Sequence, residues 1–373
     1  MFKNLDYIQK MICFFVFENY EKEKCNSMDR VVVYGTGKFF QDYKQNISGQ
    51  FEIADYVDKS GKMGERNIAA RIQDVSAEYD KVLVMVSKIG PCFEIIRQLL
   101  DNGIKNDEII LGFHLWGEYS KFSDAYVTEH GKIQLVKDNI RVLVSTEDEF
   151  HNVAEVLVLE CYKYHLDGNV PEVVFDVGMN IGDATLYFLE QEKVKKVYAF
   201  EPFYETYCRA MENLKRYENS ERLEVFQYGL SNINVRKELI FNPEMSCGQS
   251  TLADINDIAV SNYIDWGLFK PEESRKEIIE IRRSSEVFSK LMAENPFAKF
   301  ILKLDCEGEE YGIFDDLAKS GLLKKFSFIM LEWHYKSDKP LIDILKENGF
   351  SYFSMQKCVV PAMGLIYAWV ESK

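Results

Sequence analysis

Two strand-like segments that each end at an acid constrain this sequence most. Residues 173–185 read VVFDVGMNIGDAT, and residues 198–202 read YAFEP. The apolar runs predict buried strands, and Gly178 and Gly182 allow a tight turn that opens a helix. Glu201 stands at the tip of the second strand, where a carboxylate can accept hydrogen bonds from both hydroxyls of a ribose. The pair of segments therefore predicts an α/β sheet with a nucleoside site.

The turn itself argues against a dinucleotide. A dinucleotide fingerprint has the form G-x-G-x-x-G, with the pyrophosphate on a helix N-terminus. Here the turn reads D-x-G-x-x-x-G, and Asp176 and Asp183 flank it. Negative charge disfavours a pyrophosphate but favours a sulfonium and an amino group. The turn resembles the first motif of the Rossmann-like methyltransferases, a resemblance that implies S-adenosylmethionine as the cofactor.

Composition narrows the class of partner and of site. The chain has 373 residues, enough for two domains, and a formal net charge of −15, which repels nucleic acid. Its 8 cysteines are scattered, without zinc-ligand spacing, so we expect no metal site and a reduced, cytoplasmic protein. The apolar run at residues 11–17 is too short to span a bilayer, so we expect no transmembrane segment.

The N-terminal part predicts a small parallel sheet. Strand patterns at residues 30–34, 51–58, 81–87 and 108–112 alternate with helices, as in a Rossmann-like unit. Gly35 and Gly37 begin a dinucleotide-type turn, but Phe40 occupies the place of its third glycine. The unit is expected to bind a nucleotide, a sugar nucleotide or nothing. One alternative function is therefore a nicotinamide-dependent oxidoreductase that uses Gly35 and Asp58, and another is a non-catalytic nucleotide-binding module.

The C-terminal part predicts a larger sheet. A β-hairpin at residues 132–145 and a helix over 147–166 precede the strand that holds Asp176. We place the domain boundary near residues 115–130 and divide the chain into 1–120 and 121–373. The α/β fold that we expect is a Rossmann-like, seven-stranded methyltransferase sheet, preceded by the smaller parallel domain. Its remaining strands are expected at 223–228, 300–305 and 326–332, with an antiparallel pair at 350–353 and 365–370 and extra strands at 238–241 and 278–282.

The strand ends carry the chemistry, because ligands of open α/β sheets bind at the carboxyl ends of the strands. The segment KLDCEGEE at residues 303–310 places several carboxylates close together, and they repel one another unless a positive charge lies among them. Lys303 is on the same strand face as Asp305 and can supply that charge. Glu309 and Glu310 read as the solvated start of a helix.

Four segments together resemble the FkbM family of methyltransferases: FDVGMNIGD at 175–183, YAFEP at 198–202, KLDCEGE at 303–309 and LEWH at 331–334. The resemblance covers residues 130–372 and implies methyl transfer from S-adenosylmethionine to a hydroxyl of a glycan or natural product. It puts seven residues on the cofactor segments: Asp176, Gly178, Asn180, Gly182, Asp183, Glu201 and Pro202. Trp333 replaces a smaller aliphatic residue and can reshape the acceptor pocket.

Transfer to a hydroxyl is an in-line displacement that needs positioning and a general base. The catalytic candidates are Lys303, Asp305, Glu307 and His334. Histidine titrates nearest neutrality, so His334 can serve as the base. Asp305 can instead bind the methionine amino group or orient the base. The loop at residues 246–251 reads either as a lid over the cofactor or as an ordinary surface loop.

Overall fold

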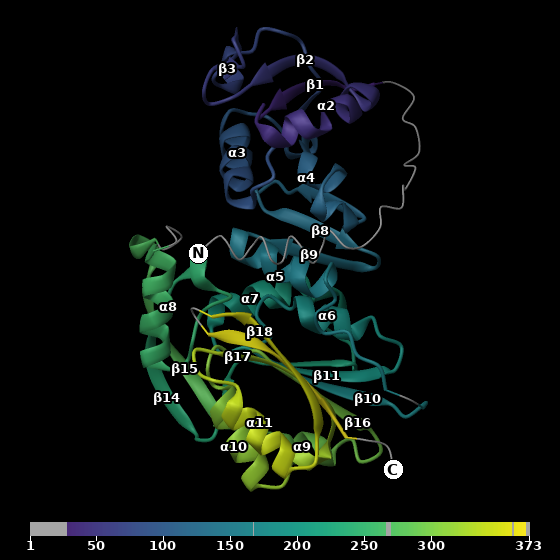
Figure 1. The fold of residues 1–373 in the computed structure, drawn as a ribbon, viewed down its shortest axis with the longest axis vertical. Helices are drawn as coiled ribbons and strands as arrows, with labels where there is room; N and C mark the ends of the chain where they lie inside the picture. Colours follow the sequence, from purple (N-terminus) through teal and green to yellow (C-terminus); the bar gives the residue numbers. More distant parts are fainter. Residues whose placement is uncertain (1–27, 167, 266–269, 360–361, 371–373) are drawn as a thin grey trace. The chain divides into compact units, whose positions relative to one another are not determined.

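A computed structural model describes residues 28–166, 168–265, 270–359 and 362–370. The apolar run at residues 11–17 lies outside these ranges. The chain divides into two compact units, Met1–Leu159 and Glu160–Lys373 (Figure 1). Among the described residues, no helix combines the length and the apolar character needed to cross a membrane.

The first unit contains the predicted parallel sheet. Its strands are β1 (Arg30–Tyr34), β2 (Glu52–Val57), β5 (Lys81–Val84) and β6 (Ile109–Leu111), in the order β2-β1-β5-β6. Helix α2 (Lys38–Gln50) connects β1 to β2, the short hairpin β3 (Lys62–Met63) and β4 (Arg66–Asn67) lies between β2 and β5, and α3 (Ile89–Asp101) connects β5 to β6. Helix α4 (Gly112–Leu115) follows β6. Phe40, in place of the third glycine, is fully buried in the core of this unit.

The division between the units falls later in the chain than the predicted boundary at residue 120. Strands β7 (Asp124–Val127), β8 (Ile133–Lys137) and β9 (Ile140–Val144) form an antiparallel sheet that includes the predicted hairpin. Helix α5 (Glu147–Leu157) then packs on α3, with the Glu147 side chain against Gly90. This packing assigns the hairpin and α5 to the first unit. Because α5 ends at Leu157, the helix predicted over 147–166 is too long.

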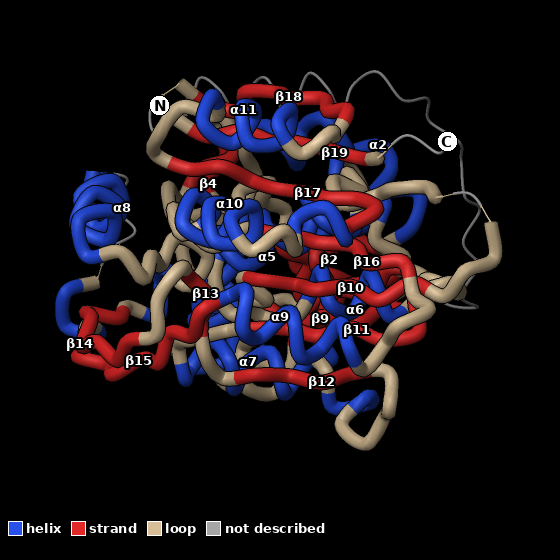
Figure 2. The backbone as a smooth tube through the Cα atoms, turned by 90° about the horizontal axis from the view of Figure 1, so that it is seen from below, coloured by secondary structure: helices blue, strands red, loops and turns tan. Residues whose placement is uncertain are grey.

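The second unit is built on the predicted seven-stranded sheet. The strand order is β12-β11-β10-β16-β17-β19-β18, which Figure 2 shows from edge to edge. The strands are β10 (Glu172–Val177), β11 (Val194–Phe200), β12 (Leu223–Phe226), β16 (Lys299–Leu304), β17 (Phe326–His334), β18 (Ser351–Cys358) and β19 (Met363–Trp369). Strand β19 runs antiparallel to both of its neighbours, β17 and β18. The other strands, β12, β11, β10, β16 and β17, are parallel to one another. The fold-class prediction is confirmed.

Side-chain alternation gives the sheet two different faces. Phe175 and Leu302 point to an apolar core shared with α9 (Ser284–Ala293), α10 (Glu310–Lys319) and α11 (Lys339–Glu347). The next residues, Asp176 and Lys303, therefore point to the other face, where α6 (Asp183–Leu189) packs on β10 and β11. Helix α7 (Tyr204–Asn213) follows β11.

The insertion after β12 forms a layer of its own. Strands β13 (Gly229–Ser231), β14 (Val235–Phe241) and β15 (Arg275–Arg283) make a three-stranded sheet in the order β13-β15-β14. Helix α8 (Ala253–Asp265) lies beside β14 in Figure 1, and Asn256 Nδ2 of α8 donates a hydrogen bond to the Ile240 carbonyl of β14 at 3.3 Å. The two extra strands predicted at 238–241 and 278–282 are thus the antiparallel pair β14 and β15.

Candidate active site

The predicted site residues lie where the strand order of the large sheet reverses. Strand β10 pairs with β11 on one side and with β16 on the other, and β17 follows β16. The chain leaves all four strands at the same edge, because they are parallel. This is the switch point at which open α/β sheets bind their ligands. The end of β10 is joined to the turn after β16 by a hydrogen bond from the Asp305 N–H to the Val177 carbonyl, 3.1 Å.

The turn after β10 is shaped by backbone conformations that few residues tolerate. Gly178, Asn180 and Gly182 have φ angles of +77°, +51° and +87°. A Cβ atom on Gly178 would lie 1.7 Å from the Asp305 carbonyl oxygen, so only glycine lets this turn approach the next strand end. Gly182 ends the turn in the left-handed region and packs against Leu214. Gly178 and Gly182 thus build the turn.

Glu201 is held between the turn and its own strand end. Its carboxylate accepts hydrogen bonds from the backbone N–H of Asn180, 3.1 Å, and from that of Phe203, 3.0 Å. The intervening Pro202 is half-buried and packs beside Gly229. Burial raises the pKa of Glu201 to about 8 although both N–H groups favour the charged form. Each oxygen accepts one hydrogen bond from the backbone and has capacity for another.

Asp183 begins α6 on the other side of the turn. Its side chain is buried, and burial raises the pKa of Asp183 to about 7, partly offset by the charge of Lys303 and by backbone hydrogen bonds. Carboxylates therefore lie at three places around this turn, at Asp176, Asp183 and Glu201. This agrees with the reading of the turn as unfavourable for a pyrophosphate.

Lys303 connects the two halves of the site. Its ammonium lies 3.1 Å from Asp176 Oδ1 and 3.9 Å from Asp305 Oδ2, and it donates a hydrogen bond to the Gly178 carbonyl at 2.5 Å. Burial disfavours the charge, but the two carboxylates outweigh it and raise the pKa of Lys303. The predicted positive charge among the acids is therefore present, and it stays charged.

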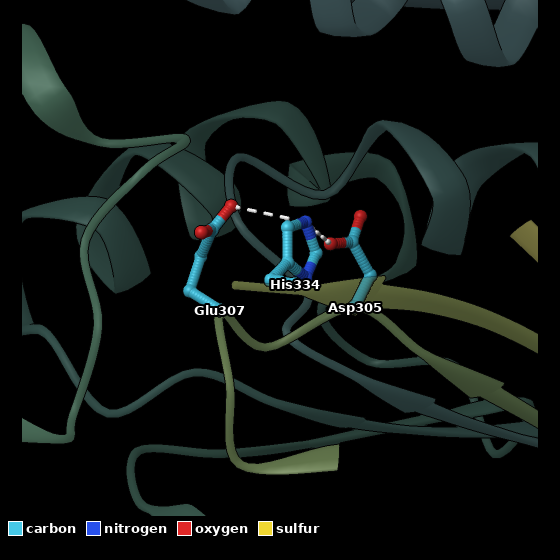
Figure 3. A group of neighbouring side chains, drawn as sticks. All are labelled: Asp305, Glu307 and His334. Carbon is cyan, nitrogen blue, oxygen red and sulfur yellow. Dashed lines mark ion pairs between the residues drawn. The ribbon is translucent and has the colours of Figure 1, made fainter. Parts of the chain in front are cut away.

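The second half of the site is a group of three side chains from two strand ends. Asp305 and Glu307 follow β16, and His334 is the last residue of β17; Figure 3 shows the two acids on either side of the imidazole. His334 Nε2 lies 3.4 Å from Glu307 Oε1 and 3.9 Å from Asp305 Oδ1. Glu307 has a φ angle of +53°, a strained conformation that directs its side chain back toward the histidine. The three catalytic candidates Asp305, Glu307 and His334 thus meet.

The three groups differ in their affinity for a proton. Burial raises the pKa of Glu307 to about 8, and the positive charge of His334 opposes this shift. Burial also disfavours charge on Asp305, but Lys303 and His334 outweigh it and lower the Asp305 pKa. His334 loses solvation too, yet Glu307 and Glu310 raise its pKa well above the ordinary value. Asp305 therefore stays ionised, whereas the pKa values of Glu307 and His334 are both raised.

Glu310 was predicted to be a solvated residue at the start of a helix, and this prediction is wrong. Its side chain has no solvent exposure and accepts a hydrogen bond from the backbone N–H of Cys306, 3.1 Å, and from that of Gly308, 2.7 Å. One of its oxygens also lies 2.9 Å from His334 Nδ1. The i, i+4 relation between Cys306 and Glu310 was the available sequence signal, because it allows a carboxylate to close the turn that precedes its own helix.

Glu309 is buried as well and faces away from His334. It accepts hydrogen bonds from Ser231 Oγ at 2.6 Å and Thr251 Oγ1 at 2.7 Å. Ser250 Oγ donates to the Glu307 carbonyl at 2.6 Å, so the loop at 246–251 is anchored to the turn after β16. Asn180 Nδ2 lies 2.9 Å from Cys247 Sγ, which ties the same loop to the turn after β10. The loop is therefore a buried wall of the site.

Two further residues of the site carry no motif of their own. Thr185 Oγ1 donates a hydrogen bond to Asp176 Oδ2 at 2.5 Å, and Tyr162 OH donates one to Asp305 Oδ2 at 2.9 Å. The Tyr162 ring also lies 5.5 Å from the Lys303 ammonium. Thr185 was within reach of sequence reasoning, since it lies in the first turn of α6, directly after the glycine turn. Tyr162 is brought in from a distant segment, and no local pattern indicates it.

Trp333 lies in the core of the second unit. Its side chain is 3% exposed and belongs to the apolar core of the second unit, packed against Gly364. It alternates with Glu332 and His334, so it points to the opposite face of β17 from them. Trp333 therefore points away from the face that carries His334, and an effect of Trp333 on the acceptor pocket stays a prediction.

Comparison with known proteins identifies a family domain in the second unit. Residues 176–352 match the model of the methyltransferase FkbM domain. A curated relative, the AMB antimetabolite synthetase AmbE of Pseudomonas aeruginosa, is 30% identical over 233 residues, which cover 52% of this chain. That alignment spans only 10% of the relative's own length.

Two solved structures also resemble the chain. The FkbM methyltransferase of Methylobacillus flagellatus covers 91% of this chain and 90% of its own, at 14% identity and a TM-score of 0.34. The N-terminal domain of human METTL16, in complex with S-adenosylhomocysteine, covers 60% of this chain and 69% of its own, at 15% identity and a TM-score of 0.29. Both TM-scores are below 0.5, so the assignment stands on the match over residues 176–352. The chain carries a methyltransferase domain of the FkbM family.

Proposed function

We propose that this protein transfers the methyl group of S-adenosylmethionine to a hydroxyl group of a natural-product or glycan acceptor. The observation that carries the proposal is the arrangement of two acidic half-sites on adjacent strand ends. One half contains Asp176 and Glu201 beside a glycine turn, and the other contains Glu307 and His334. Lys303 holds the two halves together through Asp176 and Asp305.

The residues at the end of β10 and β11 fit this cofactor. Glu201 has acceptor capacity left for the two ribose hydroxyls, since the backbone N–H groups use one site on each oxygen. Asn180 Oδ1 is buried and has no hydrogen-bond partner among the described residues, so it offers an acceptor to a bound donor. Asp176 and Asp183 supply negative charge toward a sulfonium and an ammonium group.

The residues at the end of β16 and β17 fit the removal of a proton. S-adenosylmethionine supplies an electrophilic methyl group on a sulfonium sulfur. The acceptor oxygen forms a bond to the methyl carbon as the carbon–sulfur bond breaks, and the hydroxyl proton passes to Glu307. A pKa of about 8 suits Glu307 to accept a proton near neutrality. Asp305 remains ionised and, through Lys303, keeps the turn aligned with the cofactor side.

The acceptor side is supported by a cavity and by the curated relative. A cavity of about 240 Å³ borders the same turn, and its lining includes Gly308, Tyr311, Lys237 and Lys336. Glu309 also lines this cavity and lies 3.7 Å from the Lys237 ammonium, so the lining presents both signs of charge to an acceptor. The likeness to an antimetabolite synthetase supports a natural product as the acceptor class. No disulfide joins any of the cysteines among the described residues, which supports a reducing compartment such as the cytoplasm.

The first unit does not favour a second function. Asp58 Oδ2 accepts hydrogen bonds from Thr36 N–H and Thr36 Oγ1, at 3.0 and 3.2 Å, and its Oδ1 accepts two from Ser60. The acid that a nicotinamide-dependent oxidoreductase would use for a ribose is thus engaged by its own loops.

Calorimetry tests the cofactor. We expect the full chain to bind S-adenosylhomocysteine and S-adenosylmethionine, and not NAD. Glu201→Ala should weaken S-adenosylhomocysteine binding by tenfold or more, since a charge-assisted hydrogen bond contributes about 1.5–3 kcal/mol. Glu224→Ala, a matched change at a partly exposed glutamate of β12, should bind as the unaltered protein does. Failure to bind S-adenosylhomocysteine would overturn the proposal.

Transfer of a labelled methyl group tests the reaction. Metabolite extracts from cells that lack the gene are incubated with radiolabelled S-adenosylmethionine and the purified protein, and the labelled product is identified by mass spectrometry. Glu307→Gln should lower the rate by about 10²–10⁴-fold while S-adenosylhomocysteine binding persists. A labelled product that carries the methyl group on nitrogen or carbon would contradict transfer to a hydroxyl.

A further inference from the structure

The side chains of Asp305, Glu307 and His334 form a compact group of potential metal ligands. Each residue offers one ligand atom, and these atoms all lie within 4.8 Å of one another. The sequence predicts no metal site, because the two acids follow one strand and the histidine ends another strand that is distant in the chain. The fold brings together one imidazole and two carboxylates, a mixed set of nitrogen and oxygen ligands.

The histidine is oriented as metal-binding histidines are. Glu310 Oε1 lies 2.9 Å from His334 Nδ1, and Glu310 is itself fixed by two backbone N–H groups. A carboxylate on one ring nitrogen holds the tautomer in which the other nitrogen presents its lone pair. Here that other nitrogen is Nε2, which faces Asp305 and Glu307 (Figure 3).

The spacing of the ligand atoms fits an ion between them. Two atoms that each lie about 2.1 Å from one ion are about 3.0 Å apart at right angles and about 3.4 Å apart at the tetrahedral angle. Nε2 lies 3.4 Å from Glu307 Oε1 and 3.9 Å from Asp305 Oδ1, both longer than an ordinary hydrogen bond. The distance from Nε2 to Glu307 Oε1 already matches the tetrahedral spacing, and Asp305 Oδ1 would have to move closer to complete the set.

Local charge favours a cation as well. Four carboxylates surround the imidazole, since Glu310 and Glu332 lie beside it in addition to the two proposed ligands. Lys357 pairs with Glu332 at 2.9 Å, and Lys303 lies nearer to Asp176 than to Asp305. An ion would supply the positive charge that the acids otherwise draw from a proton on the histidine.

We propose that Asp305, Glu307 and His334 bind one divalent transition-metal cation, of the Mn²⁺ or Zn²⁺ class. An ion at this place lowers the pKa of a hydroxyl that binds to it. That role rests on the proposed methyl transfer, whereas the binding of the ion does not.

The test is the binding of Mn²⁺ to the full chain after removal of metals with a chelator. The loss of the free-ion signal in electron paramagnetic resonance measures binding, and Mn²⁺ avoids competition from cysteine thiolates, which prefer softer ions. We expect one Mn²⁺ per chain, and at least tenfold weaker binding in Glu307→Gln and His334→Gln. The matched controls Glu286→Gln and His165→Gln, at exposed positions of the same unit, should bind Mn²⁺ as the unaltered protein does.

Circular dichroism reports whether each variant folds. If His334→Gln does not fold, Mn²⁺ binding by Glu307→Gln tests the site, because the Glu307 side chain is partly accessible and its replacement disturbs the core less. Absence of Mn²⁺ binding at millimolar ion would overturn the site, as would equal binding by Glu307→Gln and its control. S-adenosylhomocysteine binding is measured separately by calorimetry. A protein that binds Mn²⁺ but no S-adenosylhomocysteine would overturn the methyltransferase proposal and leave the ion site standing, and the reverse result would overturn only the ion site.

Discussion

Lys303 and Asp176 are register partners on adjacent parallel strands, and their side chains form a buried ion pair with 3.1 Å between Nζ and Oδ1. The pair lies on the face of the sheet opposite the large apolar core. Its position links the turn after β10 to the turn after β16, which also carries Asp305. The two half-sites are therefore joined through one ammonium group.

Removal of that ammonium should destabilise the fold. Lys303→Met leaves Asp176 and Asp305 without their cation, and the loss of one partner of a buried pair costs about 3–5 kcal/mol. Urea unfolding measures the effect. Lys319→Met, which breaks an exposed pair with Asp315, should cost less than about 1 kcal/mol. The double variant Asp176→Asn, Lys303→Met should recover part of the loss, and strict additivity of the two changes would contradict a direct pair.

Gly178→Ala should be far more damaging than an ordinary glycine replacement. The new Cβ atom meets the Asp305 carbonyl oxygen at 1.7 Å and also forces a left-handed backbone on alanine. Gly349→Ala is the matched control, because Gly349 has a φ angle of +83° and nothing within 4 Å of a built Cβ. We expect the control to lose about 1–2 kcal/mol of unfolding free energy and Gly178→Ala to lose more. Equal losses would show that the close approach of the two turns is not real.

Thr185→Val should lower the free energy of unfolding by removing a hydrogen bond, without creating a cavity. Valine has nearly the shape of threonine, but it cannot donate to Asp176 Oδ2, and a hydrogen bond to a charged group contributes about 1.5–3 kcal/mol. Thr185→Ser keeps the hydroxyl and should lose less unfolding free energy, although it lacks the methyl group. If serine proves the more damaging of the two, packing and not the hydrogen bond explains Thr185.

Binding of S-adenosylhomocysteine should strengthen as pH rises toward 8. Burial raises the pKa of Glu201 to about 8, so below that pH the free protein holds a proton on this carboxyl. Ribose hydroxyls bind best to the ionised form, so binding must release the proton and loses up to about tenfold in affinity per pH unit below 8. Calorimetry in buffers of different ionisation enthalpy detects the released proton. Glu201→Gln should bind more weakly with a flat pH profile between 6 and 8, and a persisting slope would assign it to another group.

The same pKa shift should affect stability in the absence of ligand. The folded-state pKa of Glu201 is raised above the unfolded value, so its contribution to stability is complete below the unfolded pKa of about 4.5 and is lost as pH rises toward 8. Urea unfolding of the unaltered protein and of Glu201→Gln across this range isolates the contribution. The difference between the two proteins should grow in favour of Glu201→Gln as pH rises.

Local pattern was sufficient for most of the strands and for the placing of Asp176, Glu201, Asp305 and His334 at strand ends. It failed where a contact across the fold decides the outcome. The helix predicted to reach residue 166 ends at Leu157, and Tyr164 instead donates a hydrogen bond to Glu172 at 2.6 Å. Glu310 was read as solvated because an acid at the start of a helix usually is. Its burial follows from two backbone N–H groups of the preceding turn and from His334, which no local sequence window contains.

The sequence alone determined which residues lie at the carboxyl ends of the strands, since apolar runs, glycine turns and following acids are written within a few residues of one another. Only the tertiary structure decided which of those ends meet. The order of the strands in the sheet places β10 between β11 and β16, and β16 beside β17. That order depends on packing between distant segments. The Lys303–Asp176 pair and the meeting of Asp305, Glu307 and His334 are its consequences.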